Sequence, residues 1–66
     1  MRLHYDKDAD ALYWRLDDSK IIESEEVQPG MVLDFNDHGQ VVGVEVLRVK
    51  SRVPHANPRQ LHFEVA

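Results

Sequence analysis

Three aspartates at alternate positions, Asp6, Asp8 and Asp10, are the cluster in this sequence that most resembles a chemical site. They match the D-x-D-x-D opening of an EF-hand calcium loop. The rest of that loop is missing, because its sixth position, a glycine, is Ala11 here and its twelfth, a bidentate glutamate, is Asp17. We therefore expect these aspartates to accept hydrogen bonds from their own backbone and to build a turn, without binding calcium.

The four histidines, His4, His38, His55 and His62, contain no i, i+4 pair and no H-x-H spacing. A zinc site needs three or four ligands close together, and the chain has no cysteine to supply a thiolate. We expect no metal and no other cofactor. A small metal- or ligand-binding protein that uses the acidic turn and these histidines is the alternative function that the sequence leaves open.

The serines and carboxylates that could act in catalysis do not lie in the sequence surroundings that catalysis requires. None of the serines Ser19, Ser24 and Ser51 lies in a strained glycine elbow that would expose a nucleophile. The carboxylates of residues 23–26 lie in a polar stretch, which supplies no apolar pocket to raise the pKa of one of them. We therefore expect the protein not to be an enzyme.

The same acidic stretch is better suited to binding. Glu23, Glu25 and Glu26 belong to a strand pattern without a purely apolar face, which is typical of a protected sheet edge. The functional alternative is a docking surface for a basic protein. Tyr13 lies on the opposite side of its strand from Trp14, and aromatic residues are enriched at interface centres. Tyr13 and the three glutamates are therefore the predicted interaction residues.

Size and composition predict one small β-rich domain over residues 1–66, with residues 52–66 as a tail. A chain of 66 residues with 42% apolar residues builds a marginal core, and without cysteine it gains no disulfide. We therefore expect a homodimer. No apolar run is long enough for a signal peptide or a membrane span, so we expect a cytoplasmic protein that does not enter membranes.

Charge is unevenly distributed along the chain. Residues 1–26 hold eight acids and four bases, residues 27–66 hold four of each, and the net charge is −4. An acidic end and a basic end can steer a charged partner or a second copy of the chain. Nucleic-acid binding through Arg48, Lys50 and Arg52 with Tyr13 is disfavoured, because the overall acidity opposes association with phosphates.

Alternation of apolar and polar residues predicts a mainly β fold, a small antiparallel sheet of five or six short strands. The expected strands are 3–5, 11–16, 21–27, 31–35, 42–46 and 61–65. Pro29 and Gly30 occupy the central positions of a type II turn, and Asn36–Gly39 fits a hairpin loop. The two turns fix where the middle strands begin and end.

Two alternatives remain for the end of the chain. Asn57 as N-cap and Pro58 at the first helical position favour one short C-terminal helical turn. Leu61, Phe63 and Val65 then alternate, which predicts a sixth strand. A helix that begins at Arg59 is the competing interpretation.

One face of the expected sheet is apolar, with Trp14 in its core. The residues of this face are Leu3, Tyr5, Leu12, Trp14, Leu16, Leu33, Phe35, Val42, Val44 and Val46. A single sheet face without a cover is unstable in water. Either the tail or a second subunit must therefore cover it.

Several motifs follow one another in a recognisable order. They are Tyr5-Asp6, Ala9–Tyr13, Glu23–Val27, Asp34–Gly39 and Val41–Leu47. Together they resemble a bacterial family known as domain of unknown function 2283, over roughly residues 2 to 50. The resemblance implies small stand-alone β-rich proteins, some encoded beside another small protein in the manner of a toxin–antitoxin pair, and it supplies no catalytic residues. We therefore expect a non-enzymatic protein-interaction module, such as the acidic partner of a small basic toxin-like protein.

Overall fold

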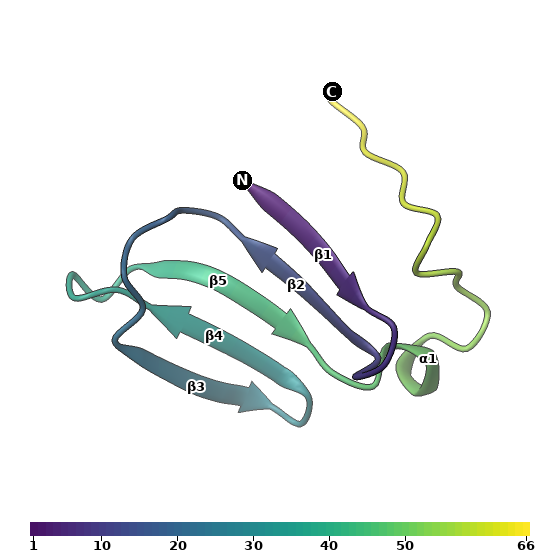
Figure 1. The fold of residues 1–66 in the computed structure, drawn as a ribbon, viewed down its shortest axis with the longest axis horizontal. Helices are drawn as coiled ribbons and strands as arrows, with labels where there is room; N and C mark the ends of the chain where they lie inside the picture. The colour runs from purple at the N-terminus through teal and green to yellow at the C-terminus, as the bar shows by residue number, and fades with distance from the viewer.

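Five antiparallel strands form a single sheet in the computed structural model, which describes residues 1–66 (Figure 1). The elements are β1 (Arg2–Asp6), β2 (Ala11–Arg15), β3 (Glu23–Gln28), β4 (Met31–Phe35), β5 (Val41–Val46) and the short helix α1 (Val49–Arg52). The strands lie in the order β1-β2-β5-β4-β3. The predicted mainly β fold is confirmed, with five strands in the sheet and β3 at one edge, as its charged pattern indicated.

Strand register confirms the predicted apolar face for the residues that pair across strands, and it adds Met31. Leu3 lies opposite Trp14, Trp14 opposite Val44, and Val44 opposite Leu33, so that one apolar row crosses four strands. A second row runs parallel to it and consists of Tyr5, Leu12, Val46 and Met31. Because successive residues of a strand point to opposite sides, the residues between these positions lie on the other, polar face.

The turns follow their residue chemistry. The Asp6 carboxylate accepts the backbone N–H groups of Asp8 and Ala9 at 3.0 and 3.1 Å, which closes the β1–β2 turn. Gly30 has φ +80°, as the third residue of a type II turn requires. Gly39 has φ +73° in the β4–β5 loop, and its N–H donates to the Asn36 carbonyl at 3.1 Å. The three turn predictions are confirmed.

Helix α1 was not expected from the sequence. Its first residue, Val49, is 6% exposed, and the Val49 N–H donates to the Asp10 carbonyl at 3.1 Å. The N–H of Lys50 donates to the Asp10 carboxylate at 3.0 Å. The β1–β2 turn thus supplies the hydrogen bonds that hold this single helical turn against the sheet.

The tail differs from its prediction. A turn does form at Asn57, whose carbonyl accepts the Gln60 N–H at 2.9 Å and whose side chain accepts the Arg59 N–H at 3.0 Å. The sixth strand at 61–65 does not form, and neither does the alternative helix from Arg59. Alternation reports which side chains share a face, but a strand also needs a neighbouring backbone to pair with, and the tail diverges from β1 (Figure 1).

The core of the single chain is very small. Its buried apolar residues are Ala11, Val42 and Val49, and no large side chain is fully buried. Trp14 is 43% exposed and Leu3 is 45% exposed. The prediction of Trp14 as a buried core residue is therefore wrong for the chain alone. The face was assigned correctly, but a sheet of one layer has no second layer to cover it.

Candidate functional site

The apolar face is the most unusual surface of the molecule. It consists of Leu3, Tyr5, Leu12, Trp14, Met31, Leu33, Phe35, Val44 and Val46. Monomeric proteins rarely expose a continuous apolar patch of this kind, and patches that are exposed commonly mark interaction sites. The apolar face therefore has the chemistry of a protein-binding surface.

A hollow of about 640 Å³ lies between the apolar face and the C-terminal tail. Its six lining residues are all apolar: Met1, Leu3, Leu12, Trp14, Leu61 and Phe63. The tail side chains remain largely in solvent, with Leu61 60% and Phe63 84% exposed. The tail thus forms one wall of an apolar cleft and leaves the face open.

The polar face carries a hydrogen-bonded row across the sheet. The Tyr13 hydroxyl donates to Oδ2 of Asp34 at 3.0 Å, and the Ser24 hydroxyl donates to Oδ1 of Asp34 at 2.5 Å. The Arg15 guanidinium donates to the Tyr13 hydroxyl oxygen at 3.3 Å. Asp34 is only 7% exposed, so its buried carboxylate is held by donors from two other strands.

Gly43 makes this row possible. It lies on β5, between the strands that carry Tyr13 and Asp34. A Cβ at Gly43 would lie 2.6 Å from the Tyr13 hydroxyl oxygen and 2.9 Å from Oδ2 of Asp34. Asp34 and Gly43 were not predicted as neighbours of Tyr13, although a glycine inside a valine-rich strand is a signal of close approach.

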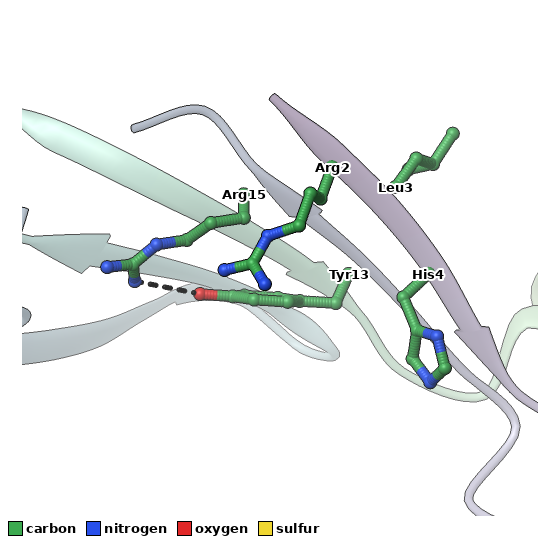
Figure 2. A pocket seen from close by; sticks show the side chains of 5 residues that line it. All are labelled: Arg2, Leu3, His4, Tyr13 and Arg15. Atoms are coloured by element: carbon green, nitrogen blue, oxygen red, sulfur yellow. Dashed lines mark hydrogen bonds between the residues drawn. The ribbon is translucent and has the colours of Figure 1, made fainter. Parts of the chain in front are cut away.

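The end of this row opens into a second hollow, of about 500 Å³, lined by Arg2, Leu3, His4, Tyr13 and Arg15. Figure 2 shows Arg2 and Arg15 reaching over the same side of the Tyr13 ring, while Leu3 points away toward the apolar face. Arg2 pairs with the exposed Asp18 at 3.4 Å, and Nε of Arg15 is buried without an acceptor. The hollow offers donors, but Arg2 is already paired with Asp18, and Arg15 already donates to the Tyr13 hydroxyl and the Ser19 carbonyl.

The predicted interaction residues are not brought together. Tyr13 is half-buried on the polar face, and its hydroxyl is used in the row to Asp34. Glu23 and Glu25 lie opposite Phe35 and Leu33, at the margin of the apolar face, and are exposed. Glu26 lies opposite Val32 and belongs to the other face. The acidic edge is therefore split between the two sides of the sheet.

The aspartates of the first turn are engaged separately. Asp6 bonds its own backbone, as predicted, while Oδ1 of Asp10 accepts the Tyr5 hydroxyl at 2.6 Å. This hydrogen bond lowers the pKa of Asp10 and is also the main reason that the pKa of Tyr5 is raised. No group of three or more histidine, aspartate or glutamate side chains converges anywhere in the structure.

These features define a class: a single-layer, five-stranded antiparallel β protein with one hydrogen-bonded polar face and one open apolar face. Residues 2–50 match the family described as protein of unknown function (DUF2283), and the chain belongs to this family. The match covers all five strands and ends within α1, so the tail lies beyond it. No curated protein and no solved structure matches the chain. The chain contains no helix long and apolar enough to cross a membrane.

Proposed function

We propose that the protein is a non-enzymatic interaction module that binds other protein chains, and that its apolar face binds a second copy of the same chain. The observation that carries this proposal is the open apolar face, on which Trp14 is 43% and Leu3 45% exposed. Sheets usually bury such a face against another layer, and two packed sheets form a core about 10 Å thick. A second copy supplies that layer.

Geometry favours a second copy as the occupant. The margin of the apolar face on β3 carries Glu23 and Glu25. The opposite side, beyond β1, carries the tail, where Arg59 is the one base and Glu64 the one acid of residues 53–66 (Figure 1). A two-fold axis parallel to the strands places the acidic margin of one copy over the tail side of the other. A self-complementary, face-to-face dimer of this kind also covers the cleft beside Trp14.

A partner of a different kind is proposed for β3. All six residues of this edge strand are exposed, and three of them are glutamates. An unpaired edge strand can accept an extended segment of another protein, and its acids favour a basic one. The dimer thus offers two acidic edges to a small basic partner, such as a toxin-like protein, and we propose that this association takes place in the cytoplasm, where a chain without cysteine needs no oxidising compartment.

The dimer is tested by measuring mass with light scattering at low micromolar concentration. We expect twice the mass of the 7.7 kDa chain. Leu3→Asp places a charge on the apolar face and should give a monomer, whereas His4→Asp, at the neighbouring exposed position of the polar face, should stay dimeric. A wild-type monomer with full thermal stability, or equal effects of the two variants, contradicts the proposal.

The heterologous partner is tested by isolating the native protein from its cells and identifying what accompanies it. We expect a small basic protein whose association is lost when Glu23, Glu25 and Glu26 are changed together to glutamine. Lys7→Gln, at an exposed position of the β1–β2 turn, serves as the control and should retain the partner. Retention of the partner by the triple variant contradicts the assignment of β3.

A further inference from the structure

Two arginine side chains converge at the corner where the β3–β4 turn meets α1. The Nη2 atoms of Arg48 and Arg52 each lie 2.9 Å from the place that a Cβ would occupy on Gly30. A hollow of about 260 Å³ opens there and is lined by Leu47, Arg48, Ser51 and Arg52. The absence of a side chain at Gly30 gives both guanidinium groups the space to approach the turn.

The backbone holds this arrangement in place. Arg48 has φ +52°, a left-handed conformation that is uncommon for a residue with a side chain. Arg52 follows four residues later, so the two side chains are neighbours across the single turn of α1. Arg52 donates to the carbonyl of Pro29, and the Leu47 N–H donates to the carbonyl of Gly30 at 2.8 Å. The fold therefore brings both side chains beside the β3–β4 turn, and the contact with Pro29 holds Arg52 there.

The positive charges of this pair are not balanced within the chain. Their common distance to Gly30 places the two Nη2 atoms within about 6 Å of each other, where like charges repel. The ion pairs of the structure, Arg2 with Asp18 and His38 with Asp37, lie elsewhere, so neither Arg48 nor Arg52 has a carboxylate within 4.0 Å. Two guanidinium groups held together in this way favour an anion that both can share.

We propose that Arg48, Ser51 and Arg52 bind a phosphate-type oxyanion, either free phosphate or the terminal phosphate of a small metabolite. A dianion neutralises both guanidinium groups, whereas a carboxylate carries a single charge. The forked N–H groups of arginine match the oxygen atoms of phosphate, and the Ser51 hydroxyl adds a further donor at the wall of the hollow. Leu47 supplies an apolar wall for the organic part of a phosphate monoester. This site is independent of the apolar face and of the dimer proposed above.

Titration of the full-length protein with inorganic phosphate, followed by amide and guanidinium NMR signals at constant ionic strength, tests the site. We expect saturable shifts at Gly30, Ser51 and the two arginine Nε–H groups, with half-saturation at about 1–10 mM. A parallel titration with glycerol phosphate distinguishes the two possible ligands. If glycerol phosphate binds about tenfold more tightly than inorganic phosphate, the ligand is a phosphorylated metabolite; if the two bind equally, it is free phosphate.

Three variants complete the test. Arg48→Gln and Arg52→Gln should each raise the half-saturation concentration at least about tenfold. Lys20→Gln removes the same charge from the exposed loop between β2 and β3 and should leave the half-saturation concentration unchanged. Arg48 makes no side-chain hydrogen bond within the chain, so Arg48→Gln keeps the fold even where loss of the Arg52 contact to Pro29 disturbs it. Shifts reproduced by sodium chloride alone, or equal effects of Arg48→Gln and Lys20→Gln, overturn the proposal.

Discussion

The polar and apolar faces of the sheet are built on the same five strands and differ in how their side chains find partners. On the polar face, Asp34 is buried at 7% exposure and accepts hydrogen bonds from Tyr13 and Ser24. On the apolar face, Trp14 and Leu3 remain more than two-fifths exposed. The buried carboxylate of the polar face finds its donors within one chain, whereas the apolar face is covered only when a second layer is present. A small sheet can thus form the hydrogen bonds of its buried polar groups within one chain and still depend on association to bury its apolar side chains.

The largest expected effect is the loss of stability in Trp14→Ala, whose size depends on whether a second layer covers the apolar face. In a dimer that buries Trp14, the change Trp14→Ala should lower the free energy of unfolding by about 3–5 kcal/mol per chain. In an isolated chain, where Trp14 is already 43% exposed, the loss should be only about 2 kcal/mol. Chemical denaturation at several protein concentrations measures the difference. Glu25→Ala, at the exposed margin on β3, is the control and should change the stability by less than about 0.5 kcal/mol.

A smaller effect is expected where the polar row crosses β5. Gly43→Ala inserts a methyl group 2.6 Å from the Tyr13 hydroxyl oxygen and should cost about 1–3 kcal/mol by overpacking. Gly39→Ala meets no atom within 4 Å and is strained only by its φ of +73°, so it should cost about 1 kcal/mol. Thermal unfolding of both variants makes the comparison. If Gly43→Ala is as stable as the parent, the close approach of Tyr13 and Asp34 over β5 is refuted.

Removal of the shared acceptor tests the polar row itself. Asp34→Ala leaves the hydroxyls of Tyr13 and Ser24 without their acceptor and should destabilise the protein by about 1–3 kcal/mol. Asp34→Asn keeps one acceptor oxygen and should lose less. The exposed Asp37 provides the matched control, because Asp37→Ala should stay within about 0.5 kcal/mol of the parent. Equal stabilities of the Asp34 and Asp37 variants in urea unfolding speak against the row.

The smallest expected effect concerns pH at the first turn. The hydrogen bond from Tyr5 lowers the pKa of Asp10 in the folded chain below its ordinary value of about 4. The stability that the ionised Asp10 carboxylate contributes is therefore fully present above about pH 4. It is lost as the pH falls through the lowered pKa that Asp10 has in the folded state. Unfolding curves from pH 6 to pH 2 should show a steeper acid loss for the parent than for Asp10→Asn. Parallel curves for the two proteins contradict this linkage.

Local features of the fold could be predicted from the sequence because local residue chemistry determines them. Pro29 and Gly30 fix a turn by their φ preferences, and the alternation around Leu12 and Val44 fixes which side chains share a face. The single turn of α1 is too short for a helical period to appear in the sequence.

The features that the sequence did not predict depend on residues that are far apart in the chain or on a second layer. The exposure of Trp14 depends on whether a second layer exists, which no pattern within β2 reports. The pairing of Tyr13 with Asp34 joins residues 21 positions apart, across a glycine on a third strand. The predicted strand at 61–65 had the right alternation, but its backbone does not pair with the free edge of β1. Sequence therefore predicted the faces, and only the three-dimensional arrangement shows which of them is complete.

The most direct test of the central claim uses the fluorescence of Trp14, the sole tryptophan of the chain, as the protein is diluted from about 100 μM to 0.1 μM. If a second copy covers the apolar face, the emission should be blue-shifted and protected from iodide at high concentration. It should then move to the red and become quenchable as the dimer dissociates, in step with the fall in mass. A spectrum and quenching that stay constant over the whole range, in a protein that remains folded and monomeric, would contradict the account.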